Sequence, residues 1–229
     1  MRRGSTRDDM PAARRARPEG RAVAPRRRFV AHAIALVAAL LAAPLPAQAP
    51  AAADAPQLSG PALLAALRAG GVTLYFRHTA TDFSQSDERF VAGDCATQRN
   101  LTDEGRRDAR AIGDALRRLG IPVGEVLASP WCRTMETARL MLGRATPSAA
   151  VRGGPAQADA GRYDELRALL ATPPAAGNVR VIASHGNPFR AVAGPPYLAE
   201  GEAAVVAPAP GGFAVVARVR KGDWPALGD

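Results

Sequence analysis

The sequence predicts an α/β fold, a three-layer α/β/α sandwich around a mostly parallel sheet. Short apolar, β-rich runs alternate with helical patterns from about residue 58 onward, and no internal repeat interrupts them. Three of these runs end abruptly in polar residues. About 175 residues carry this pattern, which is enough for one domain with a proper core.

Residues 1–53 are expected to be a leader outside this fold. Ten arginines fall in the first 28 residues, before an apolar run over 29–43 and a Pro/Ala-rich exit. This order is typical of a secretory signal, and the run is short for a membrane span of roughly 20 residues. Arg26 to Val30 also resembles a twin-arginine export signal. A disordered basic arm or an uncleaved anchor are the alternatives.

Export would make residues 54–229 the mature domain, with a periplasmic location and no stable membrane anchor once the leader is cleaved. The net charge of +9 divides into +7 from the first 28 residues (ten basic minus three acidic) and +2 from the rest (20 minus 18). The domain is therefore nearly neutral. Nucleic acid is not an expected partner, because the basic charge lies in the leader.

The first elements have clear local signals. Leu63, Leu64 and Leu67 lie at helical spacing and predict a helix over 58–70, closed by glycine. The run 72–76 suits a buried strand. The polar stretch 80–99 has no apolar period and predicts a long loop, of a kind that is usually functional in compact domains.

The clearest predicted helix begins after Thr102, a plausible N-cap followed by two acidic residues that suit the helix dipole. One apolar face continues to Leu119, and Gly120 ends the helix. A strand over 123–128 and a helix over 134–142 follow.

The last third of the domain is less uniform. Residues 147–161 are rich in Ala, Gly and Pro and specify little. A helix is predicted over 163–170 and a buried strand over 179–183. Two further strands, 203–207 and 213–219, predict a terminal hairpin.

Polar residues follow three predicted strands directly, in Arg77-His78, in Ser129 to Arg133, and in Ser184 to Asn187. In parallel sheets the ligand crevice lies beyond the carboxyl ends of the strands, so we expect these segments to meet. His78 and His185 are the only histidines outside the leader.

This combination fits phosphoryl transfer. Arginine donates paired hydrogen bonds to phosphate oxygens, which suits Arg77 and Arg133. A neutral imidazole can attack phosphorus when its other nitrogen donates a proton elsewhere, as expected for His78. A protonated His185 could then donate to the phosphoryl oxygens. No metal or other cofactor is needed for this chemistry.

From about residue 58 to the C-terminus, the chain resembles the histidine phosphatase superfamily, also called phosphoglycerate mutase-like, in its branch 1. The similar motifs are Arg77-His78-Thr79-Ala80-Thr81, Asn100 to Gly105, Ser129 to Ala138, and Ser184-His185-Gly186. The resemblance implies the fold of that family and a phosphomonoesterase acting through a phosphohistidine on His78. It also implies that Thr81 and Gly186 bind substrate, a phosphorylated small molecule or glycan.

Two departures from the family pattern matter. Thr79 replaces the usual glycine, so its side chain must be fitted beside the pocket. Gly186 stands where the acid phosphatase branch has its aspartate proton donor, and residues 143–160 lack the glutamate of the mutase-like branch. Four acids are weak candidates for the general acid: Asp82, Glu136, Asp159 and Asp164.

Cys95 and Cys132 are an even pair that can bridge in an oxidising compartment. A bridge would close a loop of roughly 37 residues, worth about 4 kcal/mol in the chain-entropy model. Two unpaired, partly buried thiols are the alternative.

Other functions fit the same residues less well. A zinc site from both histidines and both cysteines lacks the usual ligand spacing. A Cys132 hydrolase explains fewer residues, and a true mutase is at odds with the leader. The main alternative is a phosphate-binding module without turnover. Export suggests an envelope sugar phosphate as substrate.

Overall fold

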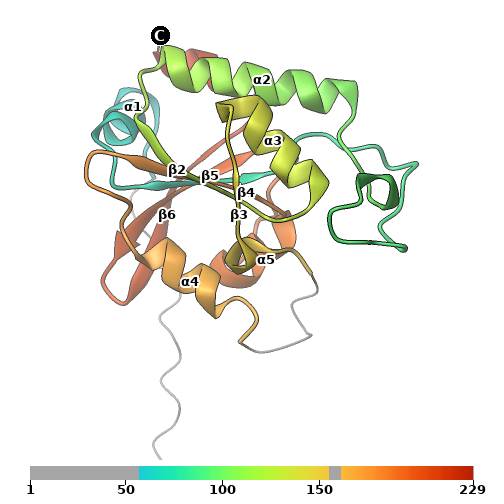
Figure 1. The fold of residues 1–229 in the computed structure, drawn as a ribbon. Coiled ribbons are helices and arrows are strands. Elements are labelled where there is room, and N and C mark those ends of the chain that lie inside the picture. The colour runs from blue at the N-terminus through green and yellow to red at the C-terminus, as the bar shows by residue number, and fades with distance from the viewer. Residues whose placement is uncertain (1–56, 155–160, 229) are drawn as a thin grey trace, which may run out of the picture. The chain divides into compact units, whose positions relative to one another are not determined.

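The computed structural model describes residues 57–154 and 161–228 of the chain (Figure 1). The predicted leader, residues 54–56 and the candidate acid Asp159 lie outside the described residues. No helix in the described part combines the length and apolar character needed to cross a membrane.

A six-stranded sheet forms the centre of the domain, in the order β3-β2-β4-β1-β5-β6. Neighbouring strands among the first four pair in parallel, whereas β5 runs antiparallel to β1 and β6 antiparallel to β5. This confirms the predicted mostly parallel sheet. The strands are β1 Thr73–Arg77, β2 Val123–Ala128, β3 Thr146–Pro147, β4 Val179–Ser184, β5 Ala203–Ala209 and β6 Gly212–Val219.

Helices cover both faces of this sheet, as Figure 1 shows. On one face lie α1 (Gly60–Ala69), α2 (Asp103–Arg118) and α3 (Cys132–Leu142), and on the other α4 (Asp164–Ala171) and α5 (Gly186–Ala193). Side chains of β1 alternate between the two cores, with Leu74 and Phe76 in one and Tyr75 in the other. Burial on both faces explains why β1 is a continuous apolar run. The predicted three-layer sandwich is confirmed.

Most elements lie within a few residues of their predicted bounds. Thr102 caps α2 as expected, because its Oγ1 accepts a hydrogen bond from the Gly105 amide at 3.0 Å. Residues 80–99 form a loop whose one regular element is the short 3-10 helix η1 (Cys95–Thr97). The terminal hairpin is present, with strands longer than predicted.

Several described elements were not predicted: β3, α5 and the 3-10 helices η1, η2 (Ala149–Val151) and η4 (Pro225–Gly228). Helix α5 starts at Gly186 and has Pro188 in its first turn, and both residues weaken a helical pattern in a sequence. Strand β3 has two residues in the Pro/Ala/Gly-rich region, held by pairing with Leu127 and Ala128. Tertiary contacts, which leave no local signal, decide such short elements.

Candidate active site

The three predicted strand ends meet at one rim of the sheet. Arg77 is level with Ser184 in the β1–β4 pairing, and the His78 amide donates to the Ser184 carbonyl at 2.9 Å. The Ser129 amide likewise donates to the Ala183 carbonyl at 3.0 Å, which aligns the end of β2. These backbone contacts place the rings of His78 and His185 edge to face, with centroids 5.5 Å apart.

His78 is buried, and its ring is held in one tautomer. Its Nδ1 lies 2.9 Å from the carbonyl oxygen of Thr79. A carbonyl oxygen only accepts hydrogen bonds, so Nδ1 carries the proton and Nε2 keeps its lone pair. Burial, and then the positive charges of Arg133 and Arg77, lower the pKa of His78 to about 3. The ring is therefore neutral and nucleophilic at neutral pH.

Thr79, the residue that departs from the family pattern, turns toward α3. Its side chain is fully buried, and its Oγ1 lies 3.3 Å from Oγ1 of Thr137. The Thr137 hydroxyl also receives the Thr79 amide at 3.3 Å and lies 2.7 Å from the carbonyl oxygen of Arg133. The extra side chain thus links the end of β1 to α3 without entering the pocket.

His185 follows β4 and is fixed from several directions. Its Nε2 lies 3.0 Å from Ser129 Oγ, and Tyr75 Oη donates to its carbonyl oxygen at 2.9 Å. Gly153 packs so closely that a Cβ there would lie 2.6 Å from His185 Cδ2. Burial, and then the charge of Arg133, lower the pKa of His185 well below its usual value. The expected protonated donor is thus neutral in the ligand-free protein. The sequence did not predict this, because burial cannot be judged from the sequence.

Arg77 and Arg133 both reach the rim, each paired with a carboxylate. Arg133 Nη1 donates to Asp87 Oδ1 at 3.1 Å, and its guanidinium lies 4.5 Å from the centre of the Trp131 ring. Arg77 donates to the Leu198 carbonyl at 3.0 Å and to Glu200 Oε1 at 3.4 Å. Both predicted phosphate arginines are therefore positioned beside the histidines.

Arg99 is a third arginine of the site, which the sequence pattern did not reveal. Its carbonyl oxygen accepts a hydrogen bond from Arg133 Nη1 at 3.2 Å, and its charge helps to lower the pKa of both His78 and His185, so Arg99 lies beside the same pocket. Its Nε is buried, with no hydrogen-bond partner in the part of the chain that the structure describes. Its position depends on the fold of the loop 80–99, which has no periodic signal.

Glu200 is a second residue that the sequence pattern missed. Its Oε1 accepts a hydrogen bond from Thr81 Oγ1 at 2.7 Å and lies 3.8 Å from His78 Nδ1. The residues before β5 reach this rim because β5 is antiparallel, with Ala203 opposite Phe76. The predicted hairpin could have indicated this placement if its pairing with β1 had been known.

The three proposed acids that lie in the described part of the chain make their contacts elsewhere. Asp82 accepts two hydrogen bonds from Ser84 within the loop. Glu136 is paired with Arg106 at 2.7 Å, and Asp164, on α4, with Arg167 at 2.9 Å. Glu200 and Asp87 are instead the carboxylates that contact the pocket arginines.

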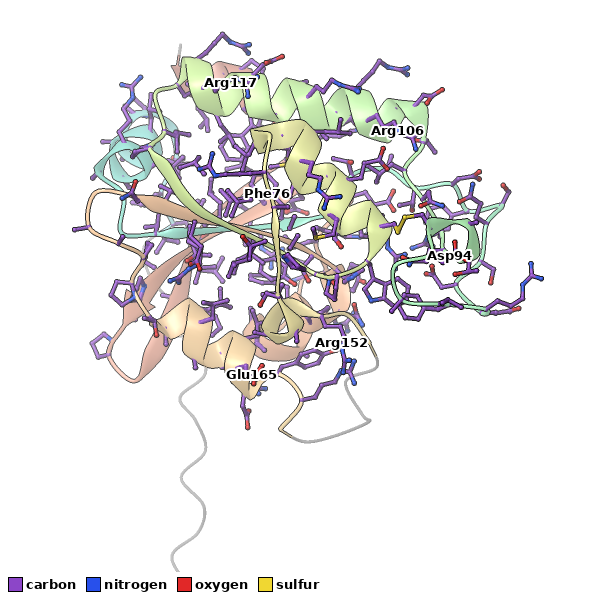
Figure 2. All side chains as sticks on the ribbon, viewed as in Figure 1. Phe76, Asp94, Arg106, Arg117, Arg152 and Glu165 are labelled. Atoms are coloured by element: carbon purple, nitrogen blue, oxygen red, sulfur yellow. A yellow bond between two sulfur atoms is a disulfide. The ribbon has the colours of Figure 1, made fainter. Side chains whose placement is uncertain are left out.

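A disulfide between Cys95 and Cys132, with Cα atoms 5.7 Å apart, joins the loop 80–99 to the start of α3. Figure 2 shows it in yellow beside the segment that carries Asp94. Neither sulfur is then a thiolate, which removes the ligands of a zinc site and the nucleophile of a cysteine hydrolase. A cavity of about 1110 Å³ adjoins the disulfide, and neither histidine lines it.

Residues 74–172 match the model of the histidine phosphatase superfamily (branch 1). The chain is therefore similar to this superfamily from β1 through α4. The matched span starts in β1 and includes His78, Arg99 and Arg133, whereas His185 and Glu200 follow it. This similarity supports phosphatase activity and phosphorylated substrates in general terms.

No curated protein matches the chain. Among solved structures, the protein histidine phosphatase SixA complexed with tungstate is 18% identical, with a TM-score of 0.49, over 66% of this chain and 97% of that chain. The mycobacterial glucosyl-3-phosphoglycerate phosphatase is 15% identical over 59% of this chain and 89% of that chain, with a TM-score of 0.46. Bacillus stearothermophilus YhfR is 17% identical over 63% of this chain and 94% of that chain, with a TM-score of 0.44.

Proposed function

We propose that this protein is an exported phosphomonoester hydrolase that acts through a phosphohistidine on His78. The observation that carries the proposal is the hydrogen-bonding distance between His78 Nδ1 and the Thr79 carbonyl oxygen, which leaves Nε2 free to attack. Three arginines around two neutral histidines supply the positive charge that a phosphate needs.

Substrate binding would place the phosphate among Arg77, Arg99 and Arg133. Phosphate oxygens would then accept hydrogen bonds from Arg77 and Arg133, either in place of the carboxylates that accept them now or together with them. The buried Nε atoms of Arg99 and Arg133 are donors with no other use among the described residues. Gly186 opens the helix that follows the second histidine, and Thr81 anchors Glu200 beside Arg77.

In the first step, His78 Nε2 attacks phosphorus, and the ester oxygen leaves with the P–O electron pair. The ring, still protonated at Nδ1, then carries positive charge. The Glu200 carboxylate, 3.8 Å from Nδ1, offsets that charge. A bound phosphate favours a protonated His185 because of its negative charge, which opposes the effect of burial on the pKa.

In the second step, water attacks phosphorus, and the P–N electron pair returns to Nε2. Inorganic phosphate then leaves, and His78 is again neutral. Asp87 is our candidate for the group that protonates the leaving oxygen in the first step, once a phosphate oxygen has replaced it on Arg133, and its carboxylate would then take a proton from the attacking water in the second step. A leaving group that departs readily reduces the demand on that acid.

Export is proposed from the leader pattern, and the disulfide is consistent with an oxidising compartment. A phosphorylated small molecule or glycan of the cell envelope, such as a sugar phosphate, is the substrate class that export suggests. Fractionation of cells expressing the full chain tests export directly. The mature protein in the periplasmic fraction supports it, and retention in the cytoplasm overturns it.

A phosphate-binding module with little or no turnover is the second candidate function. Its support is the pairing of both Arg77 and Arg133 with carboxylates, together with the absence of a dedicated acid at the family positions.

An assay of an aryl phosphate at pH 5 to 7 separates the two functions, with His78→Ala as the matched variant. The hydrolase predicts wild-type turnover and a loss of at least about a thousandfold in the variant. Wild-type protein that binds inorganic phosphate, detected as a thermal shift, without any turnover would leave only the binding module.

A further inference from the structure

Large exposed apolar side chains in the described part of the chain are concentrated beside the candidate active site. Four such residues are exposed: Phe83 (69%), Val91 (53%), Tyr197 (43%) and Phe90 (38%). Clustered apolar surface of this kind usually marks a site of binding. The rings of Phe83, Phe90 and Tyr197 are called the aromatic rim below.

Each ring of the aromatic rim contacts a pocket residue directly or through one neighbour. The Phe83 ring lies 4.4 Å from the Arg99 guanidinium, and the Tyr197 ring lies 5.2 Å from that of Arg77. Phe90 stacks on Trp131 with centroids 4.1 Å apart, and Trp131 meets the His185 ring at 5.6 Å. The exposed rings therefore border the phosphate site.

Tyr197 also packs against the backbone directly after the second histidine. A Cβ at Gly186 would overlap its ring, so the glycine is required for this contact. The family resemblance implied that Gly186 binds substrate. Gly186 also makes room for Tyr197, which is a further candidate to contact substrate.

Two polar side chains of the loop 80–99, which carries Phe83 and Phe90, form hydrogen bonds within or next to the loop. Gln85 Oε1 accepts from the backbone and side-chain nitrogens of Asn100, and Gln98 Nε2 donates to the carbonyls of Val91 and Asp94. Some polar groups of this loop are thus hydrogen-bonded within it, whereas Ser86, Glu88 and Arg89 are exposed together with Phe83 and Phe90.

We infer that the leaving group of the substrate is a planar aromatic group that stacks on the aromatic rim. The preferred substrates are aryl or arylmethyl phosphomonoesters, ahead of polyhydroxylated sugar phosphates. The inference rests on the proposed hydrolase function and replaces the sugar phosphate that export suggests with an aromatic ester. An aryl leaving group also suits a pocket without a dedicated acid, because phenols leave more readily than alkyl alcohols.

The test compares benzyl phosphate with glucose 6-phosphate on the mature protein. Both are phosphate esters of primary alcohols, so differences in leaving-group chemistry are small and kcat/KM reports mainly the fit of the group. We expect benzyl phosphate to be favoured at least about tenfold. Phe83→Ala should reduce this ratio roughly two- to tenfold, the effect of one aromatic contact. Phe83→Tyr, which keeps the ring, should preserve it.

The ratio of the two substrates is insensitive to changes in phosphate binding, including any shift of Arg99 when the Phe83 ring is removed. Equal or better turnover of glucose 6-phosphate would overturn the inference. So would a ratio that Phe83→Ala and Tyr197→Ala both leave unchanged, as expected if the rings serve protein docking. These outcomes leave the hydrolase intact, whereas no turnover of either ester, without phosphorylation of His78, defeats both proposals.

Discussion

Nδ1 of His78 lies 2.9 Å from the carbonyl oxygen of Thr79, the residue that replaces the family glycine. The contact fixes the tautomer of the proposed nucleophile, and Thr137 holds the Thr79 backbone in place. The side chain that replaces the glycine is thus accommodated by a contact with α3. The catalytic geometry depends on the backbone path after β1 more than on the side chain at position 79.

Ser129→Ala tests whether Ser129 positions His185. Its Oγ lies 3.0 Å from His185 Nε2, so its removal frees the ring and leaves a buried nitrogen without that partner. We expect kcat to fall about tenfold or more, with a shifted pH profile, while KM changes less. Ser129→Thr, which keeps the hydroxyl, should recover part of kcat. A variant with wild-type kcat and pH profile would remove Ser129 from the site.

Arg99→Ala tests the third arginine. Loss of one charge-assisted contact to phosphate corresponds to about 1.5–3 kcal/mol, or roughly 10- to 150-fold weaker inhibition by inorganic phosphate. Arg110→Ala, on the exposed face of α2, is the matched control and should leave the inhibition constant near the wild-type value. Equal inhibition of the Arg99 variant and the wild type would show that Arg99 does not contact phosphate.

The two buried histidines predict a loss of stability in acid. The pKa of His78 is about 3 in the folded state and about 6.5 when unfolded, so between these values only the unfolded state binds the proton. The free energy of unfolding therefore falls as pH decreases from about 6.5 toward 3, by up to about 1.4 kcal/mol per pH unit for this histidine. His185 acts in the same direction.

Urea unfolding in phosphate-free buffer at pH 7 and pH 5 measures this effect. His78→Asn should lose about 2 kcal/mol less than the wild type over this interval, because one titrating group is gone. Parallel losses in the two proteins would mean that His78 is not held neutral by burial.

Removal of the disulfide is expected to lower both the stability of the fold and the affinity for phosphate. It holds the loop that carries Arg99 and Asp87 next to Arg133, and the Cys132 amide donates to Gln98 Oε1 at 3.0 Å. Replacing both cysteines with serine should lower the free energy of unfolding by about 4 kcal/mol. It should also weaken phosphate inhibition, because the loop is less restrained. A destabilised variant with wild-type phosphate affinity would show that the loop does not contribute to phosphate binding.

The sequence predicted residues that end parallel strands and missed those placed by tertiary contacts. His78, Arg133 and His185 follow strands whose apolar runs are legible, and the rule for parallel sheets brings them together. Glu200 lies just before β5, the strand that pairs antiparallel with β1. Arg99 lies in a loop held by the disulfide and by its own side-chain hydrogen bonds. Local patterns do not encode either placement.

The charge state of His185 could not be predicted for a related reason. Phosphoryl transfer suggested a protonated donor, yet burial and three neighbouring arginines hold the ligand-free ring neutral. Burial is a property of the assembled fold, so only the structure shows that the pKa of this histidine is lowered.

Rapid acid-free quenching of the enzyme during turnover, followed by peptide mass spectrometry, tests the phosphohistidine most directly. We predict a phosphoryl group on the peptide that carries His78 in the wild type, and its absence in His78→Asn. His185→Asn, which slows both steps without removing the nucleophile, should still show it. Turnover with no phosphoryl group on His78, or with the group on another residue, would contradict the proposed mechanism.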